Sequence, residues 1–228
     1  MIFNIFTIFP EAFSYLNESI LKQAQKKGLV EIKIHNLRDF TDEKHRKVDD
    51  RSYGGGPGMI IKIEPLARAI LSLKLKAKNP KLKVVLFTPS GEQFNSKIAA
   101  GLAKNYKQLV LVCGHYEGID ERIKKIIYDS EIKIQEISAG PYVLTGGELP
   151  AMVLIDAVSR HLPGVLGKAE SLEEKRLGVG VPVYTRPEAF AWPPSSRGKK
   201  KKEYRVPKIL LSGNHQKIAE WRAQHRKE

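Results

Sequence analysis

The chain has 228 residues, 42% of them hydrophobic and 28% charged, which excludes an intrinsically disordered protein and favours one large domain or one domain with a small companion. Its single cysteine excludes a disulfide framework and a thiolate metal cluster, so we expect a reducing, cytoplasmic location. A net charge of +14 and a pI near 9.7 indicate a polyanionic partner, and nucleic acid is the commonest such partner in the cytoplasm.

The N-terminal part of the chain is predicted to contain two strands separated by a helix. Residues 2–8 form a short apolar run that is typical of a buried strand, and a helix is expected to begin at Pro10 and to end at Gly28. Residues 29–35 alternate between apolar and charged side chains, which predicts a second strand. The N-terminus lacks the basic start of a signal peptide, and no apolar run reaches the roughly 18 residues of a membrane span. We therefore expect no membrane association.

Residues 37–59 have no periodicity and run into a cluster of glycines. A loop of this length inside a compact domain is usually functional or disordered. A helix is predicted to begin at Glu64 and to continue through Leu73.

Three further strands are predicted at 84–87, 109–112 and 131–137, and each runs into a loop that contains glycine or proline. The third loop, residues 140–152, contains three glycines and two prolines and leads into a helix expected from about Pro150. Alternating strands and helices indicate an α/β protein with a mostly parallel sheet, whose ligands bind beyond the carboxyl ends of the strands. The three loops can therefore converge on one binding site.

The character of the sequence changes after Gly164. Residues 164–186 are glycine-rich and charged and are predicted to link a domain spanning 1–163 to a basic helical domain spanning 187–228. The last 34 residues hold eleven Lys or Arg and three Glu, a net charge of +8. Residues 191–202 form a flexible, basic excursion in this prediction, and Asn214 belongs to an N-cap before the last helix.

Several common enzyme signatures are absent from the sequence. It contains no G-x-G-x-x-G after the first strand, no G-x-x-x-x-G-K-[ST] and no H-E-x-x-H, so the dinucleotide fold, the P-loop enzymes and the common zinc sites lack support. The three strand-end loops instead supply backbone donors and acceptors without a fixed charge. They suit a neutral or zwitterionic heteroaromatic ligand better than a triphosphate.

Six segments, in order, match the motifs of one known family: YGGGPGM at 53–59, VCGHYEGIDER at 112–122, GPYVLTGGELPAM at 140–152, LIDAVSRHLPGVLG at 154–167, YTRPE at 184–188 and LLSGNH at 210–215. The chain resembles the bacterial tRNA (guanine-37, N1)-methyltransferases, the TrmD family of the SPOUT superfamily. The resemblance implies an α/β SPOUT-type fold with a deep C-terminal trefoil knot in a mostly parallel sheet, and a small helical domain that binds the tRNA anticodon stem-loop. It also implies a homodimer in which the partner completes each site, S-adenosylmethionine as methyl donor, and a requirement for Mg²⁺ without an identified metal site.

The resemblance also assigns residues to the two ligands. The loop at 49–58 is similar to the family's guanine pocket, for which we predict Asp50, Tyr53, Gly55 and Gly58. The methyl donor is expected to contact residues of the three strand-end loops, namely Phe87, Thr88, Pro89, Gly114, Tyr116, Glu117, Ser138, Ala139, Gly140, Pro141, Tyr142, Val143, Leu144, Gly146, Gly147 and Pro150.

Methylation of guanine N1 needs a base, because this nitrogen carries a proton and is a poor nucleophile until the proton leaves. Negative charge then develops on O6, where a guanidinium can stabilise it, and the family's arginine for this role matches Arg160. The family's aspartate base aligns with Lys175, and a shift of one residue brings Glu174 to that position. We predict Glu174 as the base, with Glu173 and Lys175 as the alternatives.

Two other functions stay open at this stage. In one, the protein keeps the knot and the cofactor site but is an RNA-binding protein impaired in catalysis, because Lys175 occupies the usual position of the base. In the other, it is a SPOUT enzyme that methylates a ribose 2′-hydroxyl.

Overall fold

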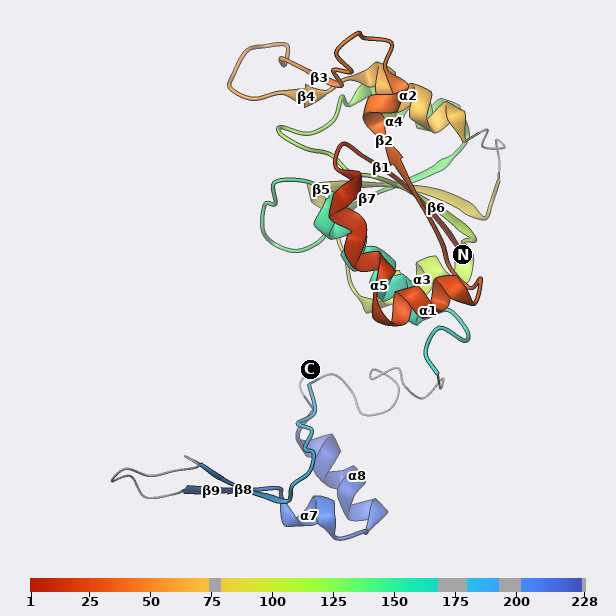
Figure 1. Cartoon of the computed structure of the whole chain (residues 1–228). Coiled ribbons are helices and arrows are strands. Elements are labelled where there is room, and N and C mark those ends of the chain that lie inside the picture. The colour runs from red at the N-terminus through yellow and green to blue at the C-terminus, as the bar shows by residue number, and fades with distance from the viewer. Residues whose placement is uncertain (74–78, 168–179, 193–201, 227–228) are drawn as a thin grey trace. The chain divides into compact units, whose positions relative to one another are not determined.

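The computed structural model describes residues 1–73, 79–167, 180–192 and 202–226. The chain divides into two compact units, Met1–Gly167 and Lys168–Glu228 (Figure 1). The first unit is built on a five-stranded sheet, and the described residues of the second form two short strands and two helices. No helix of the described residues is long and apolar enough to cross a membrane.

The sheet of the first unit has the order β2-β1-β6-β5-β7, and all four neighbouring pairs are parallel. The strands are β1 (Ile2–Thr7), β2 (Glu31–Asn36), β5 (Leu82–Gln93), β6 (Gln108–Val112) and β7 (Lys133–Ser138). The central strands β1, β6 and β5 are buried on both faces, which explains their continuous apolar runs. The predicted α/β class with a mostly parallel sheet is confirmed.

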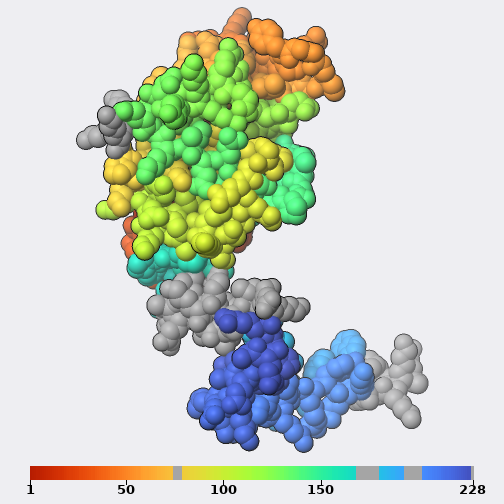
Figure 2. Space-filling view, turned by 180° about the vertical axis from the view of Figure 1, so that it is seen from behind, coloured from red at the N-terminus to blue at the C-terminus, as the bar shows by residue number. Residues whose placement is uncertain are grey.

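Helices cover both faces of the sheet (Figure 1). One apolar cluster joins the sheet to η1 (Pro10–Asn17), α1 (Ser19–Lys26), α3 (Ser96–Asn105) and α5 (Glu148–Arg160). The other joins it to η2 (Leu37–Phe40), α2 (Ile63–Ser72) and α4 (Arg122–Asp129). Seen from behind, the yellow and green segments from the middle of the chain form most of the surface of the first unit (Figure 2). Because helices cover both faces, a site is expected at the edge of the sheet where the carboxyl ends of the strands meet.

Two expected elements differ from the prediction. The single helix from Pro10 to Gly28 is instead a 3₁₀ helix followed by α1, because the backbone of Glu18 is extended between them. Strand β5 does not end before Thr88. After an irregularity between Phe87 and Glu92 it pairs with β7 again, and a Cβ on Gly91 would lie 2.6 Å from the backbone nitrogen of Ile137. Glycine therefore permits the close approach that lets β5 continue.

In the second unit, β8 (Ala189–Trp192) pairs antiparallel with β9 (Lys202–Arg205), and α7 (Lys208–Leu211) and α8 (His215–Gln224) follow. The predicted N-cap is present, because the Asn214 side chain accepts a hydrogen bond of 3.1 Å from the backbone N–H of Lys217. The expectation of a purely helical unit was incomplete. The ends of the segment predicted as a basic excursion, 191–202, belong to paired strands.

Candidate functional site

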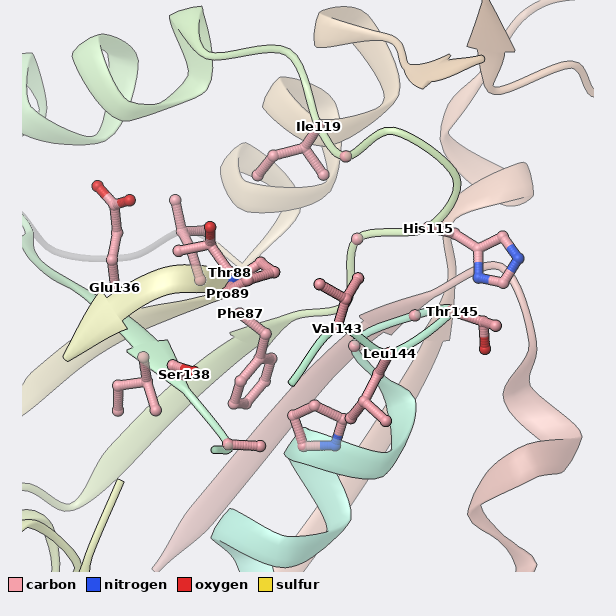
Figure 3. Close-up of a pocket in the computed structure, with 18 of the residues that line it drawn as sticks. Phe87, Thr88, Pro89, His115, Ile119, Glu136, Ser138, Val143, Leu144 and Thr145 are labelled. Carbon is pink, nitrogen blue, oxygen red and sulfur yellow. The ribbon is translucent and has the colours of Figure 1, made fainter. Parts of the chain in front are cut away.

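A pocket of about 300 Å³ lies where β6 and β7 end, beside residues 86–89 at the irregular part of β5 (Figure 3). Its walls come from the three loops that the sequence analysis singled out. Glu136 and His115 lie on opposite sides of the pocket in Figure 3, with Phe87, Val143 and Leu144 between them. All the residues predicted to contact the methyl donor line the pocket except Gly140 and Pro141.

The loop after β7 is fixed against the loop after β6 by direct contact between their backbones. The N–H of Gly147 donates a hydrogen bond of 2.8 Å to the carbonyl oxygen of Gly114. A Cβ on Gly147 would lie 2.7 Å from Cα of Cys113, a distance that side-chain carbons do not tolerate. Since β5 lies between β6 and β7 in the sheet, the loop must cross the end of β5 to make this contact. The crossing encloses one side of the pocket.

The start of α5 is held by a buried polar contact. The Thr7 hydroxyl, at the end of β1, donates a hydrogen bond of 2.7 Å to Oε1 of Glu148, and the side chains of both residues are buried. The same hydroxyl accepts a hydrogen bond from the backbone N–H of Phe9. Burial, and secondly the nearby Glu148 carboxylate, raise the pKa of the Cys113 thiol well above its ordinary value. Cys113 therefore stays a neutral thiol and acts as a packing group.

The glycine-rich loop predicted to bind guanine adjoins the second wall of the pocket. The backbone N–H of Glu117 donates to the carbonyl oxygen of Met59 over 3.1 Å, and the N–H of Ile61 donates to the carbonyl of Gly118 over 3.0 Å. These bonds tie the strands β3 (Asp49–Asp50) and β4 (Ile60–Ile61), which flank the loop, to the loop after β6. The two predicted binding loops are therefore neighbours.

The four residues predicted for the guanine pocket have different environments. Asp50 is exposed in β3 and accepts a hydrogen bond from the N–H of Arg51. Tyr53 is fully exposed, and Gly55 and Gly58 both have positive φ. None of the four lines the pocket at the strand ends. They form an exposed loop beside it.

Tyr116 connects this loop region to the pocket. Its pKa is raised, first by burial and then by the charge of the Asp49 carboxylate, while Arg38 partly opposes the shift. The hydroxyl therefore stays protonated near neutral pH and acts as a donor. Tyr116 lines the pocket and Asp49 flanks the glycine-rich loop, so the charge of Asp49 acts across the boundary between the two regions.

Of the catalytic residues predicted from the sequence, the structure describes Arg160, which does not line the pocket of its own chain. Arg160 is the last residue of α5, a helix of 13 residues that spans roughly 20 Å, and it is absent from the pocket lining. Glu174 and its alternatives, Glu173 and Lys175, lie outside the described residues. Among the described residues, one chain thus presents the predicted cofactor loops without the predicted arginine.

Several lining residues were missed by the sequence analysis. Glu136 and Lys124 belong to regular elements, so loop motifs could not reveal them, and Lys124 contacts the Glu136 carboxylate over 2.9 Å. Strand alternation could have found Glu136, since it lies two residues before Ser138 and so shares its face of β7. Across the described ranges, no cluster of three or more His, Cys, Asp or Glu side chains is arranged to hold a metal ion.

Comparison with known proteins agrees with this geometry. The family model described as tRNA (Guanine-1)-methyltransferase TrmD matches residues 1–228. The tRNA (guanine-N(1)-)-methyltransferase of Dictyoglomus turgidum is 52% identical over 96% of this chain and 82% of its own length. Proteins of the same name from Citrifermentans bemidjiense and Thermomicrobium roseum are 49% and 50% identical, over 97% of this chain and 83% and 77% of their own lengths. The chain belongs to the tRNA (guanine-N1)-methyltransferase family.

Proposed function

We propose that this protein transfers the methyl group of S-adenosylmethionine to N1 of guanine-37 in tRNA, beside the anticodon. The observation that carries the proposal is the convergence of residues 87–89 of β5 and the loops after β6 and β7 on one pocket in a member of this family. The net charge of +14 supports tRNA as the partner. We propose the anticodon stem-loop as the part that is bound and the cytoplasm as the place of the reaction.

The pocket fits the proposed methyl donor. Its volume of about 300 Å³ lies at the lower end of the range for small-molecule sites. Gly146 and Gly147 line the pocket without side chains, so a ligand can approach the main chain closely. The lining holds the carboxylates of Glu117, Glu121 and Glu136 and the ammonium of Lys124, which contacts Glu136, so its charge is negative on balance and suits a positively charged ligand. When bound, S-adenosylmethionine supplies an electrophilic methyl group.

We infer that the site is completed in a homodimer. Arg160 lies at the far end of α5 from the pocket, so a second copy must supply the guanidinium that stabilises charge on guanine O6. The first unit also exposes apolar side chains on η1 and α5, namely Tyr15, Leu149 and Val153, each at least half exposed. Burying these side chains against a second copy would remove apolar surface from water.

We propose that the chain forms the trefoil knot of the SPOUT fold. The crossing of residues 139–147 over the end of β5 supports this topology, because α5 then continues against β1 on the other side of β5. For Mg²⁺ we propose a requirement for activity without assigning residues. The base is proposed to be Glu174, which rests on its position in the segment 170–175.

The reaction can be identified from its product. A tRNA transcript with guanine at position 37 is incubated with the protein and labelled S-adenosylmethionine, then digested to nucleosides. We expect 1-methylguanosine, and we expect no label in a transcript whose position 37 is adenine. Finding a 2′-O-methyl nucleoside instead would make the protein a ribose methyltransferase. Binding of tRNA without any incorporation would make it an RNA-binding protein impaired in catalysis.

Gly147→Ala tests the role of the backbone contact in cofactor binding. The added Cβ cannot be accommodated 2.7 Å from Cα of Cys113, so the loop must shift. Overpacking of this kind costs about 1–3 kcal/mol, and we expect the dissociation constant for S-adenosylmethionine, measured by calorimetry, to rise about 5- to 150-fold. Gly101→Ala on α3 is the matched control, since nothing lies within 4 Å of its Cβ. Unchanged affinity in Gly147→Ala would contradict the proposed site.

Mixing two inactive variants tests whether the site is shared between subunits. Arg160→Ala is expected to lower kcat by about 10²–10³-fold, and Gly147→Val to abolish cofactor binding. When the two variants are unfolded together and refolded in equal amounts, about half the dimers are mixed, and each holds one intact pocket facing an intact arginine. We expect about a quarter of wild-type activity to return. If Arg160 acts on the pocket of its own chain, the mixture stays inactive.

Glu174→Gln tests the proposed base. We expect kcat to fall by about 10²–10⁴-fold with little change in tRNA affinity. Raising the pH should partly restore turnover, because N1 then loses its proton without help. Glu170→Gln, in the same segment, is the control and should keep wild-type kcat. If Glu174→Gln is fully active while Lys175→Met is inactive, Lys175 and not Glu174 removes the proton.

A further inference from the structure

Three large aromatic side chains of the second unit are about half exposed although they lie on paired strands. Phe190 and Trp192 in β8 have exposed fractions of 51% and 54%, and Tyr204 in β9 has 51%. β8 and β9 run side by side and project from α7 and α8 (Figure 1, Figure 2). Exposed aromatic surface is costly in water, and its concentration on one element indicates a binding surface.

The strand register places all three aromatic residues on one face of the hairpin. Phe190 pairs with Tyr204, Trp192 pairs with Lys202, and Phe190 and Trp192 are two residues apart. The rings of Phe190 and Trp192 are nearly parallel, with an interplanar angle of 20° and centroids 6.0 Å apart. The Nζ of Lys202 lies 5.4 Å from the centroid of the Tyr204 ring. We call Phe190, Trp192, Lys202 and Tyr204 the aromatic face.

The opposite face of the hairpin has a different chemistry. It carries the small side chains of Ala189 and Ala191, which pair with Arg205 and Glu203. Arg205 and Glu203 form an ion pair of 2.9 Å, so their charges offset each other. Aromatic surface and a lysine are thus gathered on one face, while the other face has neither.

We propose that the aromatic face binds an unpaired nucleotide of the tRNA, with the base stacked on the rings and Lys202 close to a phosphate. This inference rests on the proposed function for the identity of the RNA. Charge favours RNA over a protein partner, because residues 193–201, which connect the strands, add Arg197 and three lysines without any acidic residue.

The nucleotide must be unpaired for a physical reason. In an A-form duplex the faces of the bases are covered by their neighbours, and the deep major groove is closed to side chains. A splayed base offers a free π-face, and stacking on an aromatic ring is worth the same order of energy for every base. The hairpin therefore adds affinity for looped RNA without reading a particular sequence.

Removing the rings and removing the lysine should have separable effects on binding of the wild-type tRNA transcript. For Trp192→Ala in the full chain we expect the dissociation constant to rise about 5- to 150-fold, which corresponds to about 1–3 kcal/mol per stacked base. The dependence of affinity on salt should stay unchanged in this variant. Lys202→Ala should weaken binding and reduce the salt slope by about 0.7, as expected for one lost phosphate contact on a single strand.

Two further variants separate stacking from structural damage. Trp192→Tyr keeps a ring and should bind within a few-fold of wild type, which shows that loss of binding in Trp192→Ala is not loss of the fold. Tyr128→Ala removes a tyrosine that is 75% exposed on α4 in the first unit and should leave tRNA affinity unchanged. Equal loss in Trp192→Tyr and Trp192→Ala would overturn the stacking proposal.

Fluorescence gives a direct readout. The chain has two tryptophans, so Trp221→Phe leaves Trp192 as the only one. We expect its emission to be quenched by a single-stranded oligoribonucleotide and not by a duplex of the same sequence. No quenching, equal quenching by the duplex, or an effect of Trp192→Ala on oligomeric state in place of RNA affinity would each overturn the proposal.

Failure of the aromatic-face proposal can be told apart from failure of the proposed function, because tRNA binding and fluorescence are measured without a methyl donor. If wild-type protein forms no 1-methylguanosine but binds tRNA through Trp192, the proposed function fails and the aromatic face stands. If 1-methylguanosine forms normally and Trp192→Ala leaves the tRNA affinity unchanged, only the proposed role of the aromatic face is refuted.

Discussion

The contact between the backbones of Gly147 and Gly114 is the constraint on which the rest of the first unit depends. The hydrogen bond of 2.8 Å and the missing Cβ at Gly147 bring the loop after β7 across the end of β5 and onto the end of β6. Helix α5 can begin there only because of this crossing, and the Thr7–Glu148 contact then fixes its first turn to β1. The pocket is the space that remains between the crossing loop and the two loops it passes.

In the proposed function, this arrangement would separate cofactor recognition from catalysis. A rigid helix of 13 residues begins at the pocket and ends at Arg160, so no small rotation of a side chain can bring the guanidinium back to the pocket of the same chain. Dimerisation would therefore be part of the catalytic design and not only a source of stability. The exposed apolar side chains of η1 and α5 are next to the start of the helix whose end would reach the partner's pocket in the proposed dimer.

The sequence was sufficient to predict the strands that define the pocket, because buried parallel strands have continuous apolar runs and their loops are marked by glycine and proline. It was insufficient where a tertiary contact overrides a local signal. Thr88 and Pro89 mark a break after Phe87, yet β5 resumes because Gly91 allows β7 to approach. Glu136 was missed because its position in the pocket lining follows from the pairing of β7 with β5 and not from a sequence motif.

The β8–β9 hairpin of the second unit could not be predicted from the sequence, for a related reason. Strands of four residues carry too little periodicity to be recognised singly, and the partners β8 and β9 are separated by a basic segment that dominates the composition. Only the register reveals that Phe190 and Tyr204 are opposite each other.

In the proposed function, lysines and aromatic rings of the second unit would make different contributions to RNA affinity. Lysines give affinity that is sensitive to salt and independent of sequence, because they neutralise phosphates. Aromatic rings give affinity that depends on a base being out of its helix. A methyltransferase that must reach N1, an atom on the Watson–Crick edge, needs the target base splayed out of its stack. Holding a second nucleotide unstacked on the aromatic face would favour the same open loop conformation, because stacking energy released at the hairpin offsets stacking lost in the RNA. The charge of the second unit would then attract the tRNA, and its aromatic face would select RNA that has an opened loop.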